Sequence, residues 1–174
     1  MINAIAVASE IQSLLPEAES PRNTEGYEGF YHLTSMSGDV AHAESEYIIR
    51  DHDAEKFAAK EENLRRIEKA MNEKYGEGTV KLEIKEQYRN MAEKIRPCYH
   101  LIENAEEAAR RAGMEPIVLP IRGGTDGARL SYQGLPCPNI CTGGQNGHGR
   151  HEFVSIQSME AITEMLKELV KLFA

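Results

Sequence analysis

The side chains best suited to chemistry lie in a glycine-rich stretch from Pro120 to Phe153. Glycine tolerates positive φ and lets other atoms approach the backbone closely. A stretch of this composition therefore indicates loops that pass close to a ligand or to another segment. A guanidinium such as that of Arg122 contacts a carboxylate through two parallel hydrogen bonds, and a neutral imidazole such as that of His148 is a common zinc ligand. Glu152 follows closely enough to orient such a ligand.

Each of these residues also has a plain structural explanation. A loop that merely carries His148 and His151 into solvent needs no metal, because one histidine does not make a site. Asp126 either belongs to the turn that presents Arg122 or caps the helical turn that follows it, and we favour capping. The glycine spacing does not fit a phosphate loop, and no serine lies in a nucleophile elbow.

Composition excludes several classes of function. The 174 residues carry 20 basic and 28 acidic side chains, a formal net charge of -8, which disfavours nucleic acid as a partner. We expect no membrane segment, because no apolar run reaches about 20 residues, and no signal peptide at the N-terminus. The odd count of cysteines, at Cys98, Cys137 and Cys141, fits free thiols in a reducing compartment better than a disulfide or a structural zinc site.

The first part of the chain predicts an α+β unit. Apolar periodicity and turn residues indicate the following order: helix 2–15, strand 30–36, a turn at Gly38-Asp39, strand 41–49, helix 53–75 and strand 80–85. This order is a split βαβ unit whose first strand is absent. A strand placed before Met1 would complete a four-stranded α+β sandwich.

The pattern changes after Asn90, where we place a domain boundary. We expect helix 97–112, a short strand 117–119, a helical turn 126–133, a short strand 139–141 and a final helix capped by Ser155. Short apolar strands that alternate with helices are typical of a parallel α/β sheet. The predicted fold class is therefore α/β plus α+β, with domains at 1–90 and 91–174.

Several motifs resemble one family. The segments IRGGTDGARLSYQGLPCPN and TGGQNGHGRHEF, which begin at Ile121 and Thr142, look like the C-terminal signature of the peptidase T family of bacterial aminotripeptidases. The segments TEGYEGFYHLTSMSGD and YIIRDHD, which begin at Thr24 and Tyr47, resemble the second domain of the same family. The resemblance runs from Met1 to Ala174 without a large gap.

The resemblance implies a cytoplasmic enzyme that uses two zinc ions to release the N-terminal residue of tripeptides. Residues 1–90 resemble the family's α+β lid domain, of the kind used for dimerisation, without its first strand, and 91–174 resemble the last part of its α/β catalytic domain. His148 matches a zinc ligand, Glu152 would orient it, and Arg122 matches the arginine expected near the substrate's carboxylate. The chain departs from the family at Gln145 and Gly147, where the family tends to have aromatic residues.

The remaining family ligands and the general-base glutamate belong upstream of Met1. The chain contains no His-x-Asp motif, and its paired glutamates, Glu61-Glu62 and Glu106-Glu107, lie on predicted amphipathic helices. We therefore expect this chain to contain no catalytic residue and to provide one zinc ligand. We also expect it to be inactive unless the missing half of the enzyme is added. The alternative is a non-catalytic binding or self-associating protein, a homo-oligomer formed through exposed sheet edges.

Overall fold

The computed structural model describes residues 2–174 and shows a mixed α/β architecture in two compact units. The first unit extends to Glu86 and also contains Pro120–Gly123. The second unit contains Gln87–Leu119 and Gly124–Ala174. Within the described residues, no helix combines the length and the apolar character that crossing a membrane requires.

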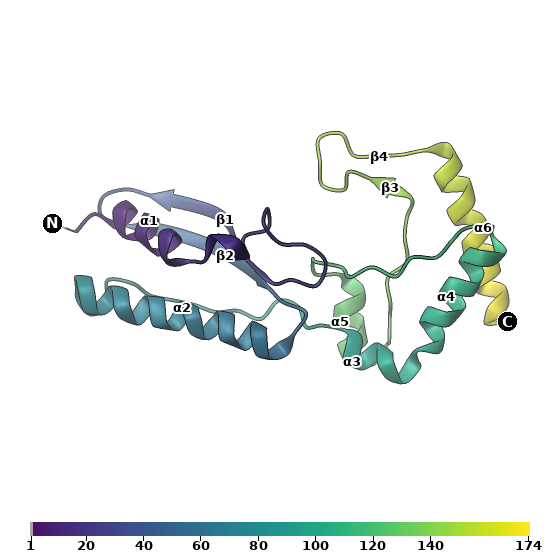
Figure 1. Ribbon diagram of the computed structural model, residues 1–174, viewed down its shortest axis with the longest axis horizontal. Coiled ribbons are helices and arrows are strands. Elements are labelled where there is room, and N and C mark those ends of the chain that lie inside the picture. Colours follow the sequence, from purple (N-terminus) through teal and green to yellow (C-terminus); the bar gives the residue numbers. More distant parts are fainter. Residues whose placement is uncertain (1) are drawn as a thin grey trace. The chain divides into compact units, whose positions relative to one another are not determined.

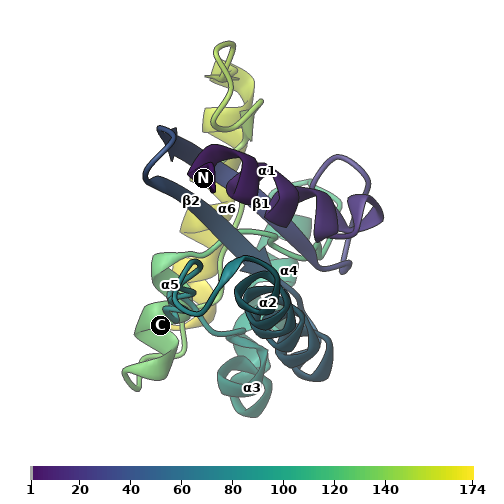
Figure 2. The same cartoon turned by 90° about the vertical axis from the view of Figure 1, so that its left-hand side faces the viewer.

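The first unit follows the predicted order closely. Its elements are α1 (Ala4–Leu14), a 3-10 turn (Glu17–Glu19), β1 (Phe30–Gly38), β2 (Ala43–Arg50) and α2 (Ala54–Tyr75). The two helices run alongside the hairpin of the two strands (Figure 1, Figure 2). The helix ends have local causes, since the side chains of Asn3 and Asp53 cap the two N-termini and Gly76, with φ of 110°, ends α2.

β1 and β2 pair antiparallel from Phe30↔Arg50 to Gly38↔Ala43, with an irregularity in β1 between Leu33 and Ser35. The hairpin loop is closed by Asp39, whose carboxylate accepts the backbone N–H groups of Ala41 and His42 at 2.8 and 3.0 Å. These two bonds hold the pKa of Asp39 below its ordinary value. The predicted turn at Gly38-Asp39 is therefore confirmed.

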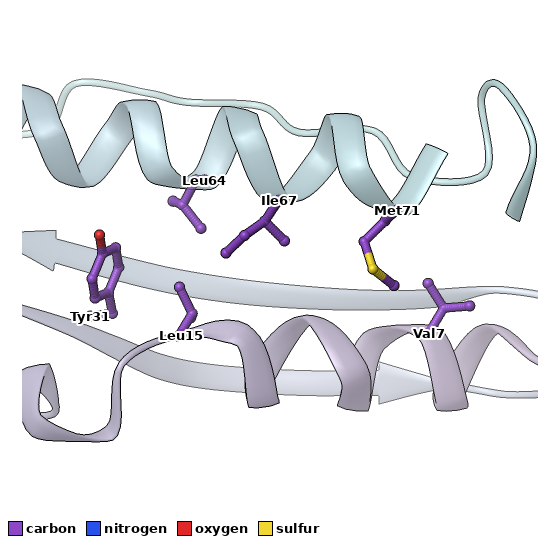
Figure 3. Packing of buried hydrophobic residues seen from close by; sticks show 6 residues of the cluster. All are labelled: Val7, Leu15, Tyr31, Leu64, Ile67 and Met71. Atoms are coloured by element: carbon purple, nitrogen blue, oxygen red, sulfur yellow. The ribbon is translucent and has the colours of Figure 1, made fainter. Parts of the chain in front are cut away.

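Figure 3 shows the core of this unit, in which side chains from both helices meet one face of the hairpin. Its buried members are Val7, Leu15, Tyr31, Leu64, Ile67 and Met71. The helical residues among them recur at the spacing of one helix face, which is why the sequence pattern identified both helices. Glu10 also ties the helices together, because its carboxylate accepts bonds of 2.6 Å from Lys74 and from Tyr75.

A buried ion pair joins the end of β2 to the start of α2. The side chains of Lys60 and Asp51 are only 10% and 2% exposed and lie 3.6 Å apart, and Glu19 also contacts the Lys60 amine. Gly29 permits this arrangement, since a Cβ atom there would lie 2.0 Å from the Asp51 carboxylate. Burial of a charge without its partner is costly, so the three side chains fix these segments together.

The prediction of a strand at 80–85 is wrong. The segment packs Val80 and Leu82 against the core, but it pairs with no strand of the described chain. Instead, the side chain of Asn72 bonds both the N–H and the C=O of Val80, and the Glu68 carboxylate accepts the N–H of Leu82. Side chains of α2 thus satisfy main-chain groups that a neighbouring strand would otherwise satisfy.

The second unit is mainly helical. Its elements are α3 (Ala92–Ile95), a 3-10 turn (Arg96–Cys98), α4 (His100–Arg111), α5 (Asp126–Tyr132), β3 (Gly144–Gln145), β4 (Phe153–Val154) and α6 (Ile156–Leu172). α4 and α6 pack side by side (Figure 1) through Ala108, Ala109 and Met165. Ser155 caps α6 as expected, with its hydroxyl accepting the N–H of Ser158.

Four predictions for the second unit need correction. The segments 117–119 and 139–141 form no strand, and Ile117 and Leu119 are 75% and 72% exposed. A parallel strand needs neighbours on which to pair, and the described chain provides none there. The cap of α5 is Thr125, whose hydroxyl accepts the N–H of Ala128, and Asp126 is the first helical residue. The helix expected from Pro97 begins instead at His100, after a 3-10 turn.

Met71 provides a test of the first core, because its side chain is 2% exposed. Met71→Ala removes buried methylene and thioether contacts and leaves a cavity, so we expect a loss of about 2–5 kcal/mol in the free energy of unfolding. Met36→Ala is the matched control, since Met36 is 38% exposed, and its effect should stay within about 0.5 kcal/mol. Urea denaturation followed by circular dichroism measures both, and equal effects would contradict this core.

Candidate functional site

His148 lies at the tip of a small hairpin that the sequence did not predict. β3 and β4 pair antiparallel at Gly144↔Val154 and Gln145↔Phe153, and the loop between them carries the histidine. Two hydrogen bonds shape the loop. The backbone N–H of Gly149 donates to the carbonyl of Asn146 at 2.9 Å, and the side-chain amide of Asn146 donates to the carbonyl of His151 at 3.3 Å. The glycine-rich composition thus produces a tight exposed loop.

The backbone of this loop is strained at His148. Its φ is 63°, and Asn146 has a φ of 54°; no other non-glycine residue in the described part of the chain has a positive φ. Asparagine and histidine both adopt this left-handed region more often than most other non-glycine residues, but at some conformational cost, which the tight loop imposes here. The imidazole is exposed at the loop tip.

Glu152 contacts the main chain of His148. Its Oε2 atom accepts the His148 N–H at 3.0 Å. The structure therefore brings together His148 and Glu152, two residues that the sequence singled out, through a backbone bond. The carboxylate thereby closes the loop, because the bond joins the two ends of the segment from His148 to Glu152.

The side chains that could bind a metal do not gather at one place in the described part of the chain. Residues 2–174 contain no group of three or more histidine, cysteine, aspartate or glutamate side chains placed to hold a metal ion. A catalytic zinc normally takes three protein ligands, so a zinc centre built from this chain alone does not fit the structure. Cys98, Cys137 and Cys141 are free thiols, in agreement with the sequence prediction.

Arg122 belongs to the first unit, where its guanidinium is tied to the segment before β1. It contacts the carbonyl of Thr24, bonds the Thr24 hydroxyl at 2.6 Å and reaches the Glu28 carbonyl at 3.4 Å. Its charge also lies 4.9 Å from the centre of the Phe30 ring. Its Nε–H is buried and has no hydrogen-bond partner among the described residues.

Sequence reasoning did not connect Arg122 with these partners. A second contact joins the same segments, since the His52 Nε2 atom lies 3.2 Å from the carbonyl of Ile121. The ring of His52 also meets that of Tyr27 edge to face at 5.1 Å. The available signal was the presence of Thr24, Tyr27 and His52 in the two motifs that resemble one family, but spacing alone does not show that they meet Arg122.

The bond between Glu152 and His148 provides a direct test. Glu152→Ala should speed hydrogen exchange at the His148 amide about tenfold, because a net bond to a charged acceptor contributes about 1.5 kcal/mol. Glu152→Gln retains an acceptor oxygen and should have a smaller effect. Glu160→Ala, at an exposed position of α6, is the control. NMR exchange rates decide the matter, and an unchanged rate in Glu152→Ala would contradict the bond.

The chain matches the family described as peptidase family M20/M25/M40 over residues 19–172. Peptidase T of Caldanaerobacter subterraneus subsp. tengcongensis is 52% identical over 173 residues, which are 99% of this chain and 42% of that protein. Peptidase T of Clostridium perfringens is 52% identical over 174 residues, or 100% of this chain and 43% of that protein. The chain thus spans less than half the length of these relatives.

Two solved structures share the fold. A tripeptidase from Staphylococcus aureus subsp. aureus Mu50 matches 98% of this chain and 45% of its own, with a TM-score of 0.65 and 17% identity. The aminopeptidase PepT from Bacillus cereus ATCC 10987 matches the same shares with a TM-score of 0.62 and 16% identity. With the family match and the strong sequence similarity, the predicted resemblance to peptidase T is confirmed, and the chain belongs to peptidase family M20/M25/M40.

Proposed function

We propose that this chain is the C-terminal portion of a zinc-dependent aminopeptidase that releases the N-terminal residue of tripeptides in the cytoplasm. The observation that carries the proposal is the presentation of His148 on a strained loop, closed by Glu152, within a chain about half identical to peptidase T. Strain at a non-glycine residue persists where the surroundings impose it, and such residues cluster at functional sites.

In this proposal His148 supplies one ligand to a metal centre whose other ligands lie in the part of the peptidase T relatives that this chain does not cover. Bound zinc in such an enzyme polarises the peptide carbonyl and lowers the pKa of a bound water. The chain's own contribution is to hold one imidazole in place, with Glu152 fixing the loop that carries it. The proposal places the other ligands and the general base in that remaining part, so the residues of this chain are expected to be inactive by themselves.

Arg122 is proposed to contact the C-terminal carboxylate of the tripeptide. A guanidinium has five N–H donors in a planar fork, and the bonds to Thr24 and Glu28 leave donors over. Those bonds and the Phe30 ring hold the fork in one orientation, which reduces the entropy lost when a carboxylate binds. Residues 1–90 would form the lid and 91–174 the catalytic portion.

A second candidate is a non-catalytic, self-associating protein. Large apolar side chains favour it: Ile117, Leu119 and Val170 are 70% or more exposed. Large exposed apolar side chains promote association between copies. We rank this candidate lower because exposure of this kind also follows if a complementary polypeptide normally covers the same residues.

Mixing experiments with His148 variants test the first candidate. The chain is combined with a separately produced polypeptide that spans the part of a peptidase T relative that this chain does not cover. With zinc, the mixture should release the N-terminal residue of a tripeptide, and either part alone should not. His148→Ala should lower the rate by about a hundredfold or more, since a catalytic zinc depends on each of its three protein ligands. His151→Ala, which changes a neighbouring exposed histidine, should leave the rate nearly unchanged.

Absence of activity in every mixture, together with growth of particle size in light scattering as concentration rises, would favour self-association instead. Activity in the isolated chain that a chelator abolishes would contradict the proposal that the other metal ligands lie outside this chain.

Arg122 requires a test that separates substrate binding from its structural bonds. In the active mixture, Arg122→Lys should raise KM for a tripeptide about tenfold or more, because a lysine has no planar guanidinium that bonds Thr24 and Glu28 and still offers a free N–H to the carboxylate. The C-terminally amidated tripeptide should show little difference between the two forms. If the variant lowers activity equally on both substrates, Arg122 acts only by holding Thr24 and Glu28.

A further inference from the structure

The loop between β3 and β4 contains a reactive pair of residues that the proposed function does not use (Figure 1). Asn146 is followed directly by Gly147, and no other asparagine in the sequence precedes a glycine. Asparagine is among the residues that are chemically labile in proteins, and the residue that follows it decides how easily its side chain reacts. A glycine in that place has no side chain to hinder the reaction.

The reaction joins the side chain of an asparagine to the next main-chain nitrogen. The Gly147 nitrogen attacks Cγ of Asn146, a new N–Cγ bond forms, and the Cγ–Nδ2 bond breaks. The side-chain nitrogen leaves as ammonia and carries away the proton that the Gly147 nitrogen loses. Water then opens the cyclic imide at one of its two carbonyls. The products are aspartate and isoaspartate, and in isoaspartate the main chain runs through Cβ and Cγ.

The surroundings of Gly147 allow its nitrogen to react. The residue is exposed, and a Cβ atom added to it would meet no heavy atom within 4 Å. Among residues 2–174, no group accepts a hydrogen bond from its main-chain N–H. Solvent therefore reaches this nitrogen, and no neighbouring side chain prevents its approach to Cγ of Asn146.

The side chain of Asn146 is held only weakly. It is exposed, and the bond from its Nδ2 atom to the His151 carbonyl is 3.3 Å long. A neutral bond of this length at the surface competes with water and leaves the amide group free to turn. Asn23 is an exposed asparagine with a shorter bond of 2.8 Å to the Glu17 carbonyl, and the β-branched Thr24 follows it. The two sites thus differ in the features that control the reaction.

We propose that Asn146 and Gly147 form a site of spontaneous modification, at which the folded chain loses ammonia and Asn146 becomes aspartate or isoaspartate. Either product lacks the N–H donor that bonds the His151 carbonyl. Isoaspartate also displaces the main-chain carbonyl that accepts the Gly149 N–H at 2.9 Å. These two bonds shape the loop that carries His148, so the modification rearranges that loop. Only its consequence for a metal ligand rests on the proposed function.

Peptide mapping by mass spectrometry measures the modification in the full chain. During incubation in mildly alkaline buffer, fragment ions should locate at Asn146 the mass gain that separates a carboxyl group from an amide. Asn23 is the internal control and should keep its mass. Gly147→Ala should slow the reaction about tenfold or more, because a methyl group restricts the approach of the nitrogen to Cγ. Equal rates in the two forms of the chain, or at the two asparagines, would overturn the proposal.

A comparison with the unfolded chain tests the structural part of the argument. Because the loop is exposed and weakly bonded, the rate at Asn146 in the folded chain should lie within about tenfold of the rate in guanidinium chloride. A folded chain that reacts more than about a hundredfold more slowly would show that the loop protects the pair, and this would overturn the proposal.

Hydrogen exchange at the Gly149 amide measures the rearrangement of the loop. In the isoaspartate form this amide should exchange about tenfold faster, because its acceptor carbonyl has moved. The variant Asn146→Asp retains that main-chain carbonyl and should show a smaller change. Incubated Gly147→Ala is the control and should keep its original rate. If the isoaspartate form also keeps the original rate, the rearrangement is refuted.

The modification and the enzyme can fail separately. Where the zinc-containing mixture is active, its rate should fall in proportion to the isoaspartate fraction, and incubated Gly147→Ala should retain its rate. A rate that stays constant as isoaspartate accumulates would overturn the effect on His148 and leave the proposed function standing. If no mixture is active, the proposed function fails, and the mass and exchange measurements still decide the modification.

Discussion

The need of every buried main-chain N–H and C=O for a hydrogen-bond partner governs this structure. β1 and β2 satisfy it for each other, and that pairing gives α1 and α2 a surface on which to pack. Where no strand partner is available, an apolar segment does not form a strand. The segment with Val80 and Leu82 stays extended and is held by Asn72 and Glu68.

The same requirement explains the contrast between the two units. In the second unit, α4 and α6 satisfy their own main-chain groups and need only side-chain contacts, which Ala108 and Met165 provide. The short apolar segments 117–119 and 139–141 need neighbouring strands and remain irregular. Only the local hairpin of β3 and β4 pairs, because its two strands are close in sequence. The loop with His148 therefore depends on a very small element and on the bond from Glu152.

The functional interpretation follows from three features of the described chain that lack interaction partners: a possible metal ligand, a sheet edge and exposed apolar side chains. One imidazole cannot form a zinc centre, and a two-stranded hairpin leaves strand edges unpaired. Large apolar side chains such as Ile117 are also exposed to solvent. The chain covers about two-fifths of the length of its relatives, and in the proposed function the part that it does not cover supplies the remaining groups. Arg122 differs, because its present partners lie in the same unit and preorganise it without any addition.

The sequence by itself determined most of the helices, the cap at Ser155, the hairpin of β1 and β2, and the family, because these depend on periodicity and motifs within short stretches. It also pointed to His148, through glycines that leave a histidine exposed. Tertiary structure alone decided that 80–85 is not a strand, that Thr24 and Phe30 hold Arg122, and that Glu152 binds the backbone of His148. Those outcomes depend on which groups meet in space and which partners are available, and periodicity within a segment carries no information about either.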